Sequence, residues 1–158
     1  MRRLALATSL SLLVACQPTA QTTATADAPA PAAAQAPAAF AFEEADIASL
    51  QKQMAEGSLT SKALTQAYLD RIAAIDDAGP TLNAVIETNP DALKDAEALD
   101  AEREAGKLRG PLHGIPVLLK DNIDAMPMVN SAGSLALASH KPKTDAFLVA
   151  KLRDAGAV

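Results

Sequence analysis

GPLHGIPVLLKDNID, residues 110–124, places a run of apolar residues directly before a lysine. Its part IPVLLK, residues 115–120, is short and continuously apolar up to Lys120, which predicts a strand buried on both faces. The backbone groups of such a strand need partners along both edges, so we expect neighbouring strands beside it. Lys120 itself has two interpretations. It is either a solvated strand end, which is the common case because lysine is rarely buried unpaired, or a lysine placed for chemistry.

Helical and extended patterns alternate along the chain from residue 40 onward. The expected helices run from Ile47 to Gly57, from Thr60 or Ser61 to Ile75, from Asn89 to Gly106 and from Thr144 to Gly156. The side chains expected to face inward in the last helix are Phe147, Leu148, Leu152 and Ala155. A second strand is expected at residues 81–87, and residues 157–158 would begin another. This alternation predicts the α/β fold class.

The first fifteen residues have the pattern of an export signal. Arg2 and Arg3 give a basic start, residues 4–14 form an apolar run, and LVAC follows at residues 13–16. The run is too short to cross a bilayer, which takes about 20 residues. The pattern resembles a bacterial lipoprotein signal peptide, which would be cut before Cys16 so that the cysteine carries lipid. A plain secretory leader with a chance cysteine is the alternative.

The segment that follows the signal has the composition of a tether. Residues 16–39 consist mainly of Ala, Pro, Thr and Gln, and such a segment cannot bury enough apolar surface to fold. We therefore expect a signal peptide at 1–15, a disordered linker at 16–39 and a folded domain at 40–158. Cys16 is the single cysteine, which excludes an internal disulfide. Gln17 after it predicts the periplasmic face of the outer membrane, in the bacterial cell envelope.

Charge and ligand spacing exclude several kinds of partner. The net charge is −5, with 14 basic and 19 acidic residues, and no basic cluster could neutralise the phosphates of a nucleic acid. His113 and His140 have no second His or Cys at ligand spacing, so no metal is expected. His113 is interpreted as a loop residue that supports the start of the strand. Asp121 and Asp124 are interpreted as turn formers as readily as an acid–base pair. No cofactor is expected.

Longer stretches carry a family resemblance. Residues 110–124, followed by SAGSLAL at 131–137, resemble the amino-terminal catalytic region of the amidase signature family. Residues 47–76 and 82–102 resemble the opening helices of that family in order and spacing, so that the resemblance covers residues 40–158. It implies the fold of that family, a mixed β-sheet covered by helices. This chain would be its N-terminal part, truncated before a Gly/Ser-rich catalytic segment.

The resemblance also implies a mechanism. The family hydrolyses carboxamide C–N bonds through a Ser-cisSer-Lys triad and an acyl-enzyme, without metal or cofactor, and Lys120 matches its lysine. Both triad serines are expected past Val158, while Ser131 and Ser134 belong to a loop typical of the family and are not the triad serines. Burial beside residues 117–119 would favour the neutral amine that a base requires. Residues 1–158 alone, with the base but neither serine, are expected to be inactive.

The partner implied by the resemblance is an amide, either a small molecule or a peptide, together with the membrane that would hold the lipid anchor. Substrate-binding residues and oligomeric state are left open. The second function considered is a truncated, non-catalytic lipoprotein that acts as a binding or surface module. The related amidotransferase that makes amidated tRNA in the cytoplasm is disfavoured by the export signal.

Overall fold

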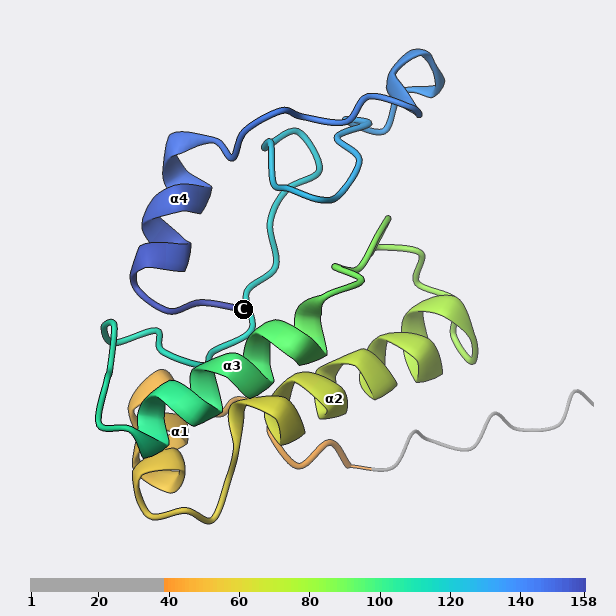
Figure 1. Cartoon of the computed structure of the whole chain (residues 1–158). Helices are drawn as coiled ribbons and strands as arrows, with labels where there is room; N and C mark the ends of the chain where they lie inside the picture. The colour runs from red at the N-terminus through yellow and green to blue at the C-terminus, as the bar shows by residue number, and fades with distance from the viewer. Residues whose placement is uncertain (1–38) are drawn as a thin grey trace, which may run out of the picture. The chain divides into compact units, whose positions relative to one another are not determined.

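The computed structural model describes residues 39–158, so that the predicted signal peptide, Cys16 and nearly all of the predicted linker lie outside the described residues. The described part contains helices joined by long loops (Figure 1). Its elements are α1 (Ile47–Ala55), α2 (Ser61–Ile72), the π-helical turn η1 (Ala73–Asp77), α3 (Ala92–Glu104), the 3₁₀ turn η2 (Leu135–Leu137) and α4 (Phe147–Asp154). No helix in this part of the chain is long and apolar enough to span a bilayer.

The predicted end of α1 and the predicted start of α2 are confirmed. α1 is capped by Asp46, whose carboxylate accepts the Ser49 N–H at 2.7 Å. Gly57 follows α1 with a φ of 74°, a left-handed conformation that glycine adopts without steric strain. Thr60 caps α2 by accepting the Ala63 N–H at 3.0 Å. Both boundaries therefore follow local sequence signals.

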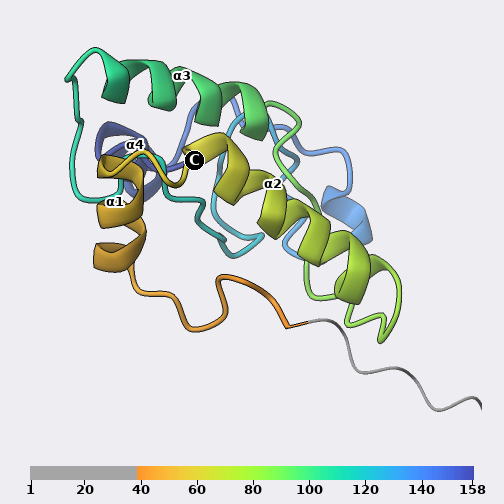
Figure 2. The same ribbon diagram turned by 90° about the horizontal axis from the view of Figure 1, so that it is seen from below.

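α2 and α3 lie side by side, as Figure 1 and Figure 2 show from two directions. Leu64 of α2 and Ala96 of α3 are fully buried. Near this contact, the Asp100 carboxylate of α3 accepts the N–H groups of Ser61 and Lys62 at 2.7 and 3.0 Å. α3 thus satisfies two of the backbone donors that the first turn of α2 leaves unpaired. The two helices are joined both by apolar packing and by hydrogen bonds to a charged group.

Two predicted helix starts are wrong. α3 begins at Ala92 because the residues before it form a turn, closed by a hydrogen bond of 3.1 Å from the Ala92 N–H to the Asn89 carbonyl oxygen. α4 begins at Phe147 and not at Thr144, because residue 146 is still extended. A capping residue in the sequence predicts a helix start only where the chain has already turned into the helix, which neither segment has done.

The inward face of α4 also differs from its prediction. Val149 is buried, whereas Phe147 and Leu148, which were expected to face inward, are 80% and 51% exposed. Helical spacing shows which side chains share a face, but not which face has a neighbour. No described segment covers these two side chains.

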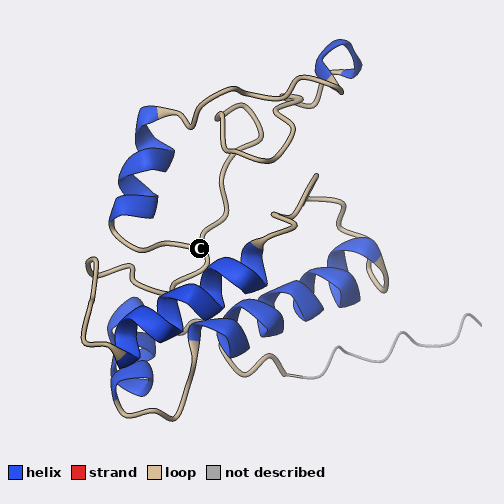
Figure 3. Ribbon diagram, in the orientation of Figure 1, coloured by secondary structure: helices blue, strands red, loops and turns tan. Residues whose placement is uncertain are grey.

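The two predicted strands are extended segments without a sheet. Figure 3 shows only helices and loops between residues 39 and 158. The segment 81–87 is held by Asp76, a buried carboxylate that accepts the N–H groups of Ala84 and Val85 at 2.7 and 3.0 Å. The mixed sheet remains a prediction for this chain.

The turn at residues 111–114 joins the helices to one another. Side chains from α1, α2 and α3 donate hydrogen bonds to its carbonyl oxygens. They are Gln51 Nε2 to Pro111 and His113 at 3.1 and 2.9 Å, Ser61 Oγ to Gly114 at 2.8 Å, and Arg103 Nη2 to His113 at 3.0 Å. The apolar core lies beside this turn and consists of Leu50, Met54, Leu64 and Ile115. The turn therefore fixes where the segment that leads to Lys120 begins.

We expect Gly156→Ala to destabilise the chain more than Gly106→Ala. Both glycines have positive φ, 88° and 72°, so each substitution costs about 1–2 kcal/mol in backbone strain. A Cβ on Gly156 would lie 2.7 Å from the Cα of His113, whereas a Cβ on Gly106 would have no neighbour within 4 Å. Overpacking at Gly156 should add about 1–3 kcal/mol. Urea unfolding of both variants, followed by circular dichroism, measures the difference, and equal free energies of unfolding would contradict the close packing.

Candidate active site

Lys120 ends an extended segment, residues 115–120, whose first residues are paired with the end of the chain. The hydrogen bonds run from Gly114 N–H to Gly156 O at 2.7 Å, from Val158 N–H to Ile115 O at 3.0 Å, and from Val117 N–H to Val158 O at 3.1 Å. Residue numbers rise together along the two segments, which is the pairing of parallel strands. The pairing expected for residues 157–158 is thus present where these segments meet.

The prediction that this segment is buried on both faces is wrong for its second half. Ile115 is buried in the core, whereas Leu118 is 76% exposed and the Lys120 side chain is also exposed. Within residues 39–158, the Lys120 ammonium takes part in no ion pair. The core covers the start of the segment, and no described residue covers its end. Sequence alone predicted the apolar character correctly but not the missing neighbour.

A pocket of about 740 Å³ lies beside the segment that carries Lys120. Its wall comes from α2, from the extended segments 84–89 and 116–121, from α4 and from residues 157–158. Most of the wall is apolar, including Leu69, Ile72, Ile86, Val117, Leu118, Ile123, Met128, Val149 and Val158, and its charged members are Arg71, Glu87, Lys120, Asp121 and Arg153. A concave apolar site with a few charged groups is typical of sites that bind small molecules.

The connection that follows the lysine folds back on itself through two aspartates. Asp121 Oδ2 accepts hydrogen bonds from Ser131 Oγ at 2.6 Å and from the Gly133 N–H at 3.1 Å. Asp124 Oδ1 accepts one from Asn130 Nδ2 at 2.5 Å. The bond from the Ser131 hydroxyl, with backbone bonds from the same loop, holds the pKa of Asp121 below its usual value. The interpretation of both aspartates as turn formers missed these contacts, because no spacing rule links the two sides of a long loop.

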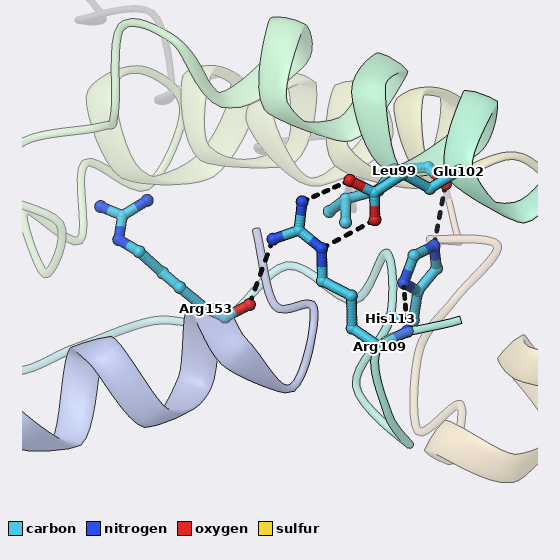
Figure 4. A network of polar contacts seen from close by, with 5 residues as sticks. All are labelled: Leu99, Glu102, Arg109, His113 and Arg153. Atoms are coloured by element: carbon cyan, nitrogen blue, oxygen red, sulfur yellow. Dashed lines mark hydrogen bonds and ion pairs between the residues drawn. The ribbon is translucent and has the colours of Figure 1, made fainter. Parts of the chain in front are cut away.

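His113 is buried, and both of its ring nitrogens have partners (Figure 4). Nε2 lies 2.8 Å from the Leu99 carbonyl oxygen and Nδ1 accepts the Arg109 N–H at 3.2 Å, so the ring proton is on Nε2. The Arg109 guanidinium donates two hydrogen bonds to Glu102, at 2.7 and 2.5 Å, and one to the Arg153 carbonyl oxygen at 3.4 Å. His113 therefore supports the loop before residue 115 and has no nitrogen free for a metal.

The pair formed by Glu102 and Arg109 was not predicted from the sequence. Their shared hydrogen bonds lower the pKa of the Glu102 carboxyl and raise the pKa of the Arg109 guanidinium. The available signal was the helix end predicted near Gly106, since a chain that reverses there brings the residues on either side together. His140 lies elsewhere, with Nε2 4.0 Å from Asp124 Oδ1. In the described range, no three His, Cys, Asp or Glu side chains are arranged to hold a metal ion.

Comparison with known proteins places the chain in a family. Residues 63–158 match the family model described as Amidase. The structure is similar to the X-ray structure of native peptide amidase from Stenotrophomonas maltophilia, with a TM-score of 0.74 and 63% identity over 76% of this chain and 24% of that chain. It is also similar to the crystal structure of an amidase family protein from Bacillus anthracis str. Ames, with a TM-score of 0.69 and 40% identity over 72% of this chain and 23% of that chain.

A similar relation holds for a sequence relative from Salinispora arenicola, which is part of its glutamyl-tRNA(Gln) amidotransferase. It is 40% identical over 112 residues, which are 70% of this chain and 22% of that protein. This chain thus spans about a fifth to a quarter of the length of these relatives. Because the family model matches more than half of its residues, and because its fold follows that of solved amidases, this chain belongs to the amidase family.

Proposed function

We propose that this chain is the N-terminal part of an amidase that hydrolyses carboxamide C–N bonds through a Ser-cisSer-Lys triad, with Lys120 as the base. The observation that carries the proposal is the place of Lys120, at the border of a mostly apolar pocket and at the end of a segment anchored to the core. The identity of 63% with the peptide amidase supports the same chemistry in this chain.

In this proposal, the nucleophilic serine attacks the carbonyl carbon of the amide. It gives its proton to the relay serine, which passes its own proton to the amine of Lys120. The proton then returns to the leaving nitrogen, and water hydrolyses the acyl-enzyme. Both serines would come from sequence beyond Val158. Residues 1–158 therefore hold the base without a nucleophile and should show no amide hydrolysis.

The surroundings of Lys120 decide whether it can act as a base. An amine accepts a proton only when it is neutral, and removal of water favours the neutral form. In the described part of the chain Lys120 is exposed, but the pocket beside it presents Val117, Leu118 and Ile123. We propose that the rest of the amidase domain covers the open side of this pocket. The base would then be completed by apolar surfaces from both sides.

The name of the similar enzyme suggests the first substrate. The Stenotrophomonas protein is a peptide amidase, so we propose that this chain belongs to an enzyme that acts on peptide amides. The apolar pocket wall formed by Ile72, Ile86 and Val149 fits an apolar side chain next to the scissile amide.

We expect Lys120→Ala to abolish amide hydrolysis in a chimaera. The chimaera is the Stenotrophomonas peptide amidase in which residues 40–158 of this chain replace the matching segment. Loss of a general base should lower kcat by about 10²- to 10⁴-fold. Hydrolysis of a peptide amide, followed by release of ammonia, measures the effect.

Lys94→Ala is the matched control for this experiment. Lys94 lies on α3 with 83% of its side chain exposed, 3.9 Å from Asp91, and it is not part of the pocket wall. The control should keep the activity of the unsubstituted chimaera, and both variants should melt at similar temperatures. If the Lys120 variant retained full activity, Lys120 would lose its role as the base.

We further propose that the chain is exported and anchored by lipid at Cys16, on the periplasmic face of the outer membrane. The support is the basic start at Arg2 and Arg3, the apolar run at residues 4–14 and LVAC before the cleavage point. The composition of residues 16–39 suits a spacer between membrane and enzyme.

Cys16→Ser should remove both the lipid and the membrane attachment when the protein is made in a Gram-negative host. The thioether that would hold the lipid needs the cysteine sulfur. Metabolic labelling with an alkyne fatty acid and cell fractionation check this. Label incorporation into the serine variant, or absence of label from the unchanged protein, would contradict lipidation at Cys16.

A further inference from the structure

Asp121 is the residue after Lys120, and it receives hydrogen bonds from one loop at three points. Its carboxylate accepts from Ser131 Oγ at 2.6 Å and from the Gly133 N–H at 3.1 Å, and its carbonyl oxygen accepts from the Ala132 N–H at 3.1 Å. Both the side chain and the backbone of Asp121 are therefore held by residues 131–133.

The conformation of this loop depends on the acceptors that Asp121 provides. Ala132 and Gly133 have φ values of 49° and 70°, and an alanine seldom adopts a left-handed conformation without a compensating contact. The loop is closed by a hydrogen bond of 2.8 Å from the Ser134 N–H to the Ser131 carbonyl oxygen. The N–H groups of Ala132 and Gly133 meet their acceptors only in this arrangement.

Lys120 thus lies between two anchors. On one side, the Val117 N–H is bonded to the Val158 carbonyl oxygen at 3.1 Å. On the other side, Asp121 is bonded to the loop, and the Ile123 N–H closes a turn on the Lys120 carbonyl oxygen at 3.0 Å. The ammonium itself has no ion pair within the described residues, so its place in the pocket is set by the backbone on either side of it.

Charge is consistent with an acceptor role for Asp121. The Ser131 hydroxyl and the backbone N–H groups of the loop hold the pKa of its carboxyl below the usual range, so that the group is ionised at neutral pH. An ionised carboxylate accepts hydrogen bonds and has no proton to give. Asp121 is therefore suited to holding the loop and not to acid catalysis.

We propose that Asp121 is a positioning residue, which together with Ser131 fixes the 131–133 loop against the turn after Lys120 and so sets the place of the lysine amine in the pocket. This inference rests on the proposed role of Lys120 as the base. A base displaced by about 1 Å loses much of its effect, because proton transfer needs hydrogen-bond distance to the relay serine.

The first arm of the test uses the 158-residue chain and measures hydrogen exchange at the amides of Ala132 and Gly133. Asp121→Ala and Ser131→Ala should each raise these exchange rates by about ten-fold, since each removes a bond that holds the loop. Ser131→Thr keeps the hydroxyl and should leave the rates unchanged. Asp70→Ala is the matched control, because Asp70 is an exposed carboxylate that accepts a side-chain hydrogen bond from Gln66 at 2.8 Å, on α2. Unchanged exchange in the Asp121 and Ser131 variants would overturn the proposal.

The second arm measures kcat and KM of the same variants in the peptide amidase chimaera, well below its melting temperature. We expect kcat to fall about ten-fold or more for Asp121→Ala and Ser131→Ala, with KM nearly unchanged, and to be restored by Ser131→Thr. The effects of the two alanine substitutions should not multiply in the double variant, because each removes the same contact. A purely structural role would lower the melting temperature and leave kcat intact, which overturns the positioning role.

The two proposals fail in different ways. An inactive chimaera with the unsubstituted sequence contradicts the proposed amidase function, and the positioning role falls with it because no base is then left to position. An active chimaera in which Asp121→Ala keeps full kcat overturns only the positioning role. An active chimaera with the expected losses supports both.

Discussion

The carbonyl oxygens of the 111–114 turn are the point on which the rest of the described structure depends. Gln51, Ser61 and Arg103 reach them from three different helices. Buried carbonyl groups without donors would cost free energy comparable to the lost bonds, so the helices and the turn specify one another. His113 adds a further link, because its ring bonds α3 through the Leu99 carbonyl oxygen. A loop that spacing rules would leave variable is thereby made rigid.

This rigidity has a chemical consequence for Lys120. The segment from residue 115 onward leaves the turn in a fixed direction and is paired with residues 157–158 before it reaches the lysine. Beyond the lysine, Asp121 closes the connection onto its own later part. A long, flexible side chain without an ion partner is thus carried on a backbone that is held from both sides. Preorganisation of this kind places a reactive group at lower entropic cost than contacts to the side chain itself would.

Local signals in the sequence were sufficient where the structure is decided locally. Thr60 and Gly57 mark helix boundaries because capping and left-handed φ are properties of one turn. They failed where a distant neighbour decides. Phe147 is exposed although its spacing predicted burial, and the contact between Asp121 and Ser131 spans a loop that no periodicity describes. The family resemblance predicted the family correctly because it depends on long ordered matches. It did not predict how much of the pocket residues 39–158 would leave uncovered.

The uncovered surface is itself informative about the chemistry. Ile86 and Leu118 are 62% and 76% exposed, and both belong to the wall of the pocket beside Lys120. Clustered exposed apolar side chains in a folded chain mark a surface that another surface covers. Covering these residues removes water from the pocket, and removal of water is also what turns an ammonium into an amine able to accept a proton. Burial of the apolar wall and activation of the base are therefore one event. The same contacts that complete the fold would switch Lys120 from a solvated cation to the base of the proposed triad.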